Sequence, residues 1–342
     1  MQNVAIKDCP LSIDDKVKLI EQTIVQSPRF KDIIEKIEEC HCRSKLTVEP
    51  RCMLIIGDTG LGKTTIGEFY AERHPRIIDK DGTTIPVLYS IIPSGATVKS
   101  LAERLLEDIG DPLYYKGTKA SMTSRFCRLV VACGVQLIIL DEFQHIIDRD
   151  SLKVLHSTAD WLKEILNRTK VPVILIGMPS SVSILTENAQ LMRRFAAQVE
   201  LKTFEWQPQE ERNDFLRFLK VLEQAMPMSK PSKLYAEDMA LRVFCATKGI
   251  TSRIKNLISK AAQITYEKGL ECITMGVLAL AYDKELAVYD LSEPNPFQVE
   301  CGDLKLPERT QNSQISDEAG GRRGGNNKKR TRAGSVANML HK

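Results

Sequence analysis

Residues 57–64 form a glycine-rich loop of the kind that holds phosphate groups. They read Gly57-Asp58-Thr59-Gly60-Leu61-Gly62-Lys63-Thr64. Four apolar residues from Met53 to Ile56 precede the loop, as expected of a buried strand, and a helix-forming stretch from Thr65 to Ala71 follows it. Glycines let backbone N–H groups curl around a phosphate, and a helix N-terminus adds the positive end of its dipole. This order predicts a site for a nucleoside triphosphate.

The end of the loop carries two side chains that can act on such a ligand. Lys63 supplies a positive charge to the β- and γ-phosphates, and the hydroxyl of Thr64 can ligate Mg²⁺. The predicted nucleotide contacts are Gly57, Asp58, Thr59, Gly60, Leu61, Gly62, Lys63, Thr64 and Thr65.

Two adjacent acids, Asp141 and Glu142, follow the apolar run from Leu137 to Leu140. A carboxylate at the end of a buried strand next to the phosphate-loop strand can hold the Mg²⁺ shell, which suits Asp141. A neighbouring acid can orient and polarise the attacking water, which suits Glu142. Together with the loop, this pair predicts hydrolysis of the bound triphosphate.

The elements that must position these motifs alternate between strands and helices. Residues 11–47 predict two helices separated at Pro28. Strands are expected at 53–56, 85–92, 135–140 and 171–176, and helices at 98–109, 121–133 and 151–167. Such alternation favours an α/β fold with a parallel sheet covered by helices on both faces. After residue 206 only helical patterns follow, at about 209–225, 236–247, 251–268 and 274–288.

Four segments are therefore expected along the chain. They are a helical N-terminal extension (1–50), a nucleotide-binding α/β domain (51–206), a helical lid domain (207–290) and a flexible basic tail (291–342). Six Arg or Lys residues without an acid lie between 322 and 332, and they could hold DNA weakly by counterion release or dock an acidic groove on a partner. Residues 304–307 and 336–340 are candidate hooks for such a partner.

Composition restricts the class of protein. The chain has 342 residues, 43% hydrophobic and 27% charged, which is ordinary for a soluble globular protein. It has no apolar run near the ~20 residues that cross a bilayer and no signal-peptide pattern at Met1, so we expect a cytoplasmic protein without a membrane partner. Nine scattered cysteines favour reduced thiols, and Cys40-His41-Cys42 with Cys52 matches no common zinc spacing.

Charge is unevenly distributed along the chain. The net charge is +4, but residues 309–342 contain eight basic and two acidic residues and contribute +6, so residues 1–308 contribute −2. If residues 1–308 bind nucleic acid, they must use a local patch.

With these motifs in this order, the sequence resembles the AAA+ ATPases. In that family an inserted strand lies beside the phosphate-loop strand of a three-layer parallel sheet core, and an all-helical lid subdomain follows. The resemblance implies ATP and Mg²⁺ as ligands. It also implies an arginine finger at Arg193 or Arg194, which reaches the nucleotide of a neighbouring subunit, and a lid arginine, sensor 2, at Arg253.

One position departs from the AAA+ pattern. The strand at 171–176 is usually followed by a polar residue, sensor 1, that positions the water. Here Gly177-Met178-Pro179-Ser180 follows, and Met178 cannot play that role, although Ser180 could. The departure implies slow or partner-timed hydrolysis.

Smaller signatures resemble the TniB/TnsC group, the ATP-dependent regulators of Tn7-like transposons. They are Leu175 to Pro179, Asp141 to His145, and Gln190 to Phe195. This resemblance spans about residues 30–285 and implies a homo-oligomer, a hexameric or heptameric ring or a helical filament, that forms on double-stranded DNA when ATP is bound. Such a protein links a target-selecting factor to the transposase, and hydrolysis disassembles it.

Candidate DNA contacts flank the second helix of the ATPase domain, because rings of this kind follow phosphates with basic and hydroxyl side chains. They are Lys99, Ser100, Lys116, Thr118, Lys119 and Arg125.

Two alternatives use the same core. One is an ATPase of the secretion or replication-initiator type, although neither a peptidoglycan-binding module nor a membrane span is evident, and the region after 290 is too short and polar for a winged helix. The other is a non-hydrolysing DNA-binding scaffold that uses ATP as structural glue, which the Met178 departure favours.

Overall fold

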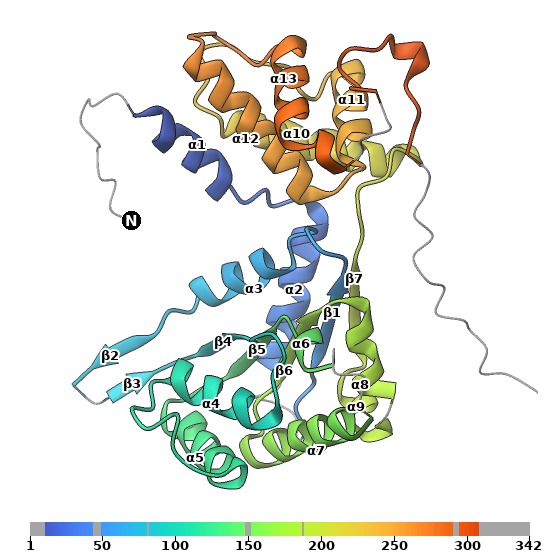
Figure 1. Ribbon diagram of the computed structural model, residues 1–342. Coiled ribbons are helices and arrows are strands. Elements are labelled where there is room, and N and C mark those ends of the chain that lie inside the picture. The colour runs from blue at the N-terminus through green and yellow to red at the C-terminus, as the bar shows by residue number, and fades with distance from the viewer. Residues whose placement is uncertain are drawn as a thin grey trace, which may run out of the picture. The chain divides into compact units, whose positions relative to one another are not determined.

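Five parallel strands form the central sheet of the computed structural model (Figure 1). They are β1 (Met53–Gly57), β4 (Val87–Ile91), β5 (Leu137–Asp141), β6 (Val173–Gly177) and β7 (Ala197–Leu201). Their order across the sheet is β4-β5-β6-β1-β7. Strands β1, β5 and β6 are buried at every residue, as expected of strands covered on both faces. The predicted parallel α/β sheet is confirmed.

The structure describes residues 11–43, 49–80, 82–147, 152–186, 188–289 and 294–307. The predicted basic tail lies outside these residues from position 308 onward, as do residues 1–10 of the predicted N-terminal extension. The described residues up to Leu306 belong to one compact unit.

The order of the strands corrects one expectation about Asp141. Its strand, β5, is not next to the phosphate-loop strand β1, because β6 lies between them and pairs with both. Helix α7 (Leu152–Thr169) forms the crossover that brings β6 into this central place. All these strands run in one direction, so their carboxyl ends still meet at one edge of the sheet.

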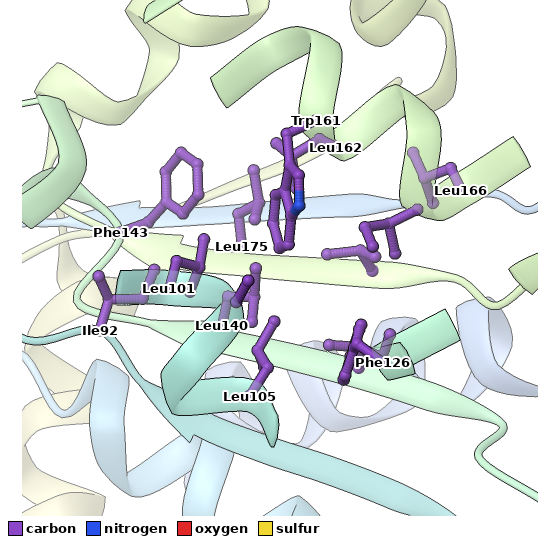
Figure 2. Packing of buried hydrophobic residues seen from close by; sticks show 14 of the residues in the cluster. Ile92, Leu101, Leu105, Phe126, Leu140, Phe143, Trp161, Leu162, Leu166 and Leu175 are labelled. Atoms are coloured by element: carbon purple, nitrogen blue, oxygen red, sulfur yellow. The ribbon is translucent and has the colours of Figure 1, made fainter. Parts of the chain in front are cut away.

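Alternate residues of the central strands pack on opposite faces of the sheet. Leu54, Leu140 and Leu175 belong to one hydrophobic cluster with α4 (Val98–Ile109), α5 (Lys119–Ala132) and α7. Figure 2 shows Leu101, Phe126 and Trp161 from these helices gathered over Leu140 and Leu175. Ile55, Ile139 and Ile176 face α2 (Pro28–Arg43) and α3 (Lys63–Glu72) on the other side. This is the predicted three-layer arrangement.

Helix α4 shows how the sequence specifies one of these layers. Its six buried residues, Val98, Leu101, Ala102, Leu105, Leu106 and Ile109, recur every three or four positions and so form one apolar face. Thr97 and Ser100 form a capping box at its start, and Gly110 ends it with a φ of +99°. The predicted bounds, 98–109, match the structure.

Four helices form the predicted lid: α10 (Gln209–Gln224), α11 (Glu237–Thr247), α12 (Thr251–Glu267) and α13 (Met275–Glu285). Their hydrophobic cluster also contains Phe204, Trp206, Ile20 and Val25. Ile20 belongs to α1 (Ile13–Gln22), which lies beside α12 (Figure 1). Helix α1 of the predicted N-terminal extension therefore packs on the lid. The boundary near 206 stays a prediction, and the packing changes between Leu201 and Phe204.

Residues 294–299 also attach to the lid. The buried guanidinium of Arg242 donates to the carbonyl oxygens of Pro296 at 2.8 Å and Val299 at 2.7 Å. Phe297 is 5% exposed within the lid cluster.

The sequence analysis missed several elements. Strands β2 (Ile77–Asp79) and β3 (Gly82–Thr84) form an antiparallel hairpin, and β7 forms an edge of the main sheet. The others are short helices: α6 (Gln144–Ile147), η1 (Pro179–Val182), α8 (Ser183–Thr186), α9 (Ala189–Arg194), η2 (Ala287–Tyr289) and η3 (Cys301–Asp303).

Candidate active site

The loop between β1 and α3 presents free backbone donors at the start of a helix. Gly60 and Gly62 have φ values of +83° and +91°, which glycine adopts without steric cost. Gly62 precedes α3 and offers no side-chain cap, so the N–H groups of the first turn are available to an anion. Lys63 is 6% exposed, and its Nζ donates to the carbonyl oxygen of Asp58 at 2.9 Å.

Asp141 is fully buried at the end of β5. Its Oδ1 accepts a hydrogen bond from the backbone N–H of Glu142 at 2.7 Å, and its Oδ2 accepts one from the hydroxyl of Tyr89 at 2.8 Å. Tyr89 lies on the neighbouring strand β4 and was not predicted. Its ring passes so close to Gly67 of α3 that a Cβ there would lie 2.8 Å from the ring. A glycine at position 67 is therefore needed for this contact.

Burial shapes the electrostatics of these groups. It lowers the pKa of Lys63, and the negative charges of Glu142 and Asp141 partly oppose the change. Burial raises the pKa of Tyr89, as do the charge of Asp141 and the hydrogen bond to it. Tyr89 therefore stays protonated and acts as a donor.

Gln144 connects the two loops that follow β5 and β6. Its side-chain amide donates to the Glu142 carboxylate, and its Oε1 accepts the backbone N–H of Met178 at 3.0 Å. Glu142 itself has a φ of +57°, which is strained for a non-glycine residue. Ser180, the predicted substitute for sensor 1, is exposed in η1 and borders neither of the two cavities described below. The buried polar group beside Met178 is Gln144, which sequence reasoning missed.

A cavity of about 310 Å³ lies over the loop, and half of the predicted nucleotide-binding and catalytic residues line it. It is lined by Thr59, Gly60, Gly62, Lys63, Thr64, Thr65, Glu142, Gln144, Met178, Thr251, Ser252 and Lys255. Phosphate-binding donors, a carboxylate and the start of α12 thus face one space. Asp141 lies behind Glu142 and does not line it.

A larger cavity of about 500 Å³ shares Gly62, Thr65, Thr251 and Lys255 with the first. Its remaining walls come from the α1–α2 connection, α2, the phosphate loop, α3, β7, the segment after β7, and α10. They include the aromatic rings of Phe30, Phe204 and Phe218. A cleft of this size, with both aromatic and charged side chains in its walls, can take a planar base and its sugar next to a phosphate site. The sequence analysis did not predict these residues, because they are brought together from distant parts of the chain.

The lid meets the phosphate loop through backbone contacts. The N–H of Ser252 donates to the carbonyl oxygen of Gly60 at 2.9 Å, and a Cβ on Gly60 would collide with the Ser252 side chain. Arg253, the predicted sensor 2, lines neither cavity. Its guanidinium lies over the ring of Tyr289, 4.8 Å from the ring centre.

The two arginine-finger candidates at the end of α9 differ in their surroundings. Arg194 donates to Oδ1 of Asn167 at 2.8 Å and lies 3.7 Å from a carboxylate oxygen of Glu49. Arg193 is exposed and has no hydrogen bond or ion pair within the described part of the chain. Neither residue lines the cavities of its own chain.

A sequence profile described as "Bacterial TniB protein" matches residues 16–207, more than half of the chain. This chain belongs to the TniB family. No curated protein matches it significantly.

Solved structures with a similar fold confirm that this TniB-family chain has the predicted AAA+ fold. Cdc6p from Pyrobaculum aerophilum is 12% identical, with a TM-score of 0.59, and the match covers 81% of this chain and 74% of Cdc6p. The ORC2 protein of Aeropyrum pernix, in ADPNP and ADP complexes, is 14% identical, with a TM-score of 0.57 and coverage of 78% and 71%. The ORC1 protein of the same organism, in complex with DNA, is 15% identical, with a TM-score of 0.55 and coverage of 78% and 69%.

The candidate DNA contacts of the TniB-family chain lie near the starts of α4 and α5. Lys99 and Lys116 are exposed, and Lys119 is exposed with its Nζ 3.2 Å from the Ser157 hydroxyl. Ser100 and Thr118 belong to the capping boxes of the two helices.

Arg125, the sixth candidate, points toward its own loop. Its guanidinium pairs with the buried carboxylate of Asp111 and donates to the carbonyl oxygens of Leu113 and Lys116. In this chain Arg125 thus shapes the loop that presents Lys116.

The segment Cys40-His41-Cys42 does not build a metal site with other described residues. His41 contacts the Tyr70 hydroxyl at 2.9 Å and Gln136 at 3.2 Å, and the described residues contain no group of three His, Cys, Asp or Glu that could hold a metal. Mg²⁺ needs few protein ligands because phosphates and water complete its shell. The hydroxyl of Thr64 lines the smaller cavity and fits that requirement, whereas the Asp141 carboxylate, which does not line the cavity, fits it only through a bridging water. Among the described residues, no helix is long and apolar enough to span a membrane.

Proposed function

We propose that this TniB-family protein is an ATP hydrolase that assembles on double-stranded DNA in its ATP state. It links target-site selection to transposase recruitment in Tn7-like transposition, and hydrolysis disassembles it. The observation that carries this proposal is the single cavity of about 310 Å³ where the phosphate loop, Glu142 and the start of α12 meet.

Nucleotide binding uses the loop and the two adjoining cavities. The phosphates lie against the N–H groups of residues 57–65 and the ammonium of Lys63, and the base occupies the larger cavity. Bound Mg²⁺, held by Thr64 and Asp141, would neutralise charge on the phosphates. The ADPNP and ADP complexes of the similar A. pernix ORC2 protein support an adenine nucleotide.

Hydrolysis requires a water molecule activated beside the γ-phosphate. Glu142 faces the cavity and takes the role of the base that orients this water. Gln144 holds the Glu142 carboxylate and the backbone of Met178 at once, so it can take over the positioning role that Met178 lacks. This contact supports the hydrolase over a non-hydrolysing scaffold.

Assembly places a second subunit over the nucleotide. Arg193 is exposed and does not line the nucleotide cavity of its own chain, which supports a role toward the nucleotide of a neighbouring subunit. Lys99, Lys116 and Lys119 are exposed near the starts of α4 and α5, two helices that pack together, which supports phosphate contacts to DNA there.

The role in transposition rests on the family and on the resemblance to TniB/TnsC regulators over about residues 30–285. It implies two protein partners, a target-selecting protein and the transposase. The similar A. pernix ORC1 protein has been solved in complex with DNA, which supports a DNA-bound assembly.

The decisive experiment combines turnover with imaging. Phosphate release and the lifetime of DNA-bound assemblies are measured for wild type, Glu142→Gln, and Glu72→Gln, which removes an exposed acid from α3 as a matched control. Glu142→Gln should stop phosphate release and prolong the assemblies, whereas Glu72→Gln should behave as wild type. If Glu142→Gln changes neither quantity, the hydrolase proposal fails.

Electron microscopy with a non-hydrolysable ATP analogue, with and without duplex DNA, tests the assembly step. Rings or filaments that need both ligands are expected. Monomers under all conditions would overturn the assembly model.

A further inference from the structure

Helix α12 turns two of its basic residues in opposite directions. An α-helix advances roughly 100° per residue, so Thr251, Ser252 and Lys255 share a face. Arg253, two residues before Lys255, projects from nearly the opposite side of the helix. The shared face lines the phosphate cavity, and Ser252 bonds to the phosphate loop. Arg253 stacks on Tyr289 instead. The cation that α12 presents to the nucleotide cavity is therefore Lys255.

Lys255 also holds the C-terminal end of α1. Its Nζ donates to the carbonyl oxygen of Glu21 at 2.8 Å. Glu21 is the penultimate residue of α1, where carbonyl groups lack helical partners and the helix dipole is negative. The last turn of α1 contains no basic residue of its own, so Lys255 supplies the charge that stabilises this end.

Helix α1 runs along α12, but few of its side chains are buried in that contact. Ile20 is its one fully buried residue, and the ammonium of Lys16 lies 5.0 Å from the ring centre of Tyr266. Ile13 and Leu19 are 36% and 45% exposed. Loss of the Lys255 hydrogen bond would thus weaken the attachment of the C-terminal end of α1 to the lid.

A bound phosphate competes with the Glu21 carbonyl for this ammonium. A triphosphate carries several full negative charges, whereas Lys255 now faces the negative end of one helix dipole, worth roughly half a charge, and the single carboxylate of Glu21. Burial lowers the pKa of Lys255, which indicates that its present surroundings compensate the positive charge only in part. Because Lys255 lines both cavities, it needs no rearrangement of α12 to turn from α1 to the ligand.

We propose that Lys255, and not Arg253, is the lid residue that contacts the phosphates of bound ATP, and that this contact replaces its hydrogen bond to Glu21. The docking of α1 on the lid thereby reports whether the nucleotide site is filled. This inference rests on the proposed function, since it requires that the chain binds ATP.

The test uses the full chain, with a fluorescent ATP analogue for affinity and hydrogen exchange of residues 13–22 for α1. In wild type, ATP with Mg²⁺ should increase exchange in α1. Lys255→Met should weaken ATP binding roughly tenfold or more, raise α1 exchange without nucleotide, and abolish the response to ATP. Lys255→Arg, which keeps the charge, should restore much of the affinity. Lys260→Met on the same helix, away from both cavities, should match wild type in each measurement.

Each other outcome has a definite meaning. If wild type binds no ATP, the proposed function fails and this inference fails with it. If wild type binds ATP but Lys255→Met binds equally well, or if Arg253→Met alone weakens binding, only the inference is overturned. It is also overturned if ATP binds to wild type without changing exchange in α1. A circular dichroism spectrum and a wild-type melting temperature identify Lys255→Met as folded.

Discussion

Two adjacent arginines offer a test of subunit-to-subunit catalysis, because the fold gives them opposite environments. The side chain of Arg194 is 14% exposed and donates to Asn167, and a hydrogen bond to a charged group is worth about 1.5–3 kcal/mol. Its other partner, Glu49, is 69% exposed, so that pair adds at most a few tenths of a kcal/mol. Arg194→Ala should therefore cost about 2 kcal/mol.

The melting temperature translates these energies into a measurement. At roughly 2–4 °C per kcal/mol for domains of this size, Arg194→Ala should lower it by about 4–8 °C. Arg193 is exposed and has no polar partner among the described residues, so Arg193→Ala should shift it by no more than about 2 °C.

The two substitutions should have the opposite ranking in their effect on ATP turnover. An arginine finger contributes about 10³-fold or more to turnover. Arg193→Ala should therefore reduce the rate of DNA-stimulated ATP hydrolysis by about 10³-fold, whereas the affinity of the monomer for ATP should stay as in wild type. Mixing Arg193→Ala with Glu142→Gln should restore part of the turnover, because an interface between the two variants can pair an intact glutamate with an intact arginine. The reasoning is refuted if Arg193→Ala melts as early as Arg194→Ala, or hydrolyses ATP like wild type.

Three further predictions concern residues around the loop. Gly60→Ala should lose ATP affinity and about 2–3 kcal/mol of stability, because a Cβ is strained at this positive φ and collides with the lid. Gly269 also has a positive φ but lies in open space, so Gly269→Ala should lose about 1 kcal/mol of stability and keep its affinity for ATP. Tyr89→Phe should cost about 1–2 kcal/mol in urea unfolding and reduce Mg²⁺-dependent turnover roughly tenfold, because the buried Asp141 loses a donor. Alkylation at pH 8 should label Cys52 only after unfolding, since burial raises its pKa to about 12 and leaves almost no thiolate.

Each of these three predictions has a result that would contradict it. Equal loss of ATP affinity in both glycine variants would contradict the contact between lid and loop. For Tyr89→Phe, unchanged Mg²⁺ dependence would mean that the hydroxyl does not support Asp141. Mass spectrometry that finds native Cys52 alkylated as fast as the exposed Cys42 would contradict its burial.

Local patterns specified most of the sheet and lid. The spacing of six apolar residues with Thr97 and Gly110 at the ends defined α4 to the residue. Strand β4 begins at Val87 although the apolar run begins at Ile85, because Pro86 has no N–H for the ladder. The alternation in Ala197–Leu201 was a usable signal for β7, and Asp81-Gly82 was one for the hairpin.

The rest of the site depends on contacts between distant segments. Gln144 reaches Met178 only because β5 and β6 end side by side, and the single sequence carries no sign of that register. The larger cavity joins residues near 30, 60, 200 and 255. Arg253 and Lys255 could be told apart only once the orientation of α12 was known.

The attachment of residues 294–299 to the lid by Arg242 has a mechanical consequence. Helix α1 and residues 294–299 are both fixed to the lid, near opposite ends of the described chain. Force applied to residues 294–299 is therefore transmitted first to the lid. It reaches the rest of the fold through the segment after β7, the backbone contact between Ser252 and Gly60, and the ion pairs of Arg29 in α2 with Glu211 and Asp214 in α10. Because the lid bonds directly to the phosphate loop at Gly60, we expect traction on residues 294–299 to change the position of that loop.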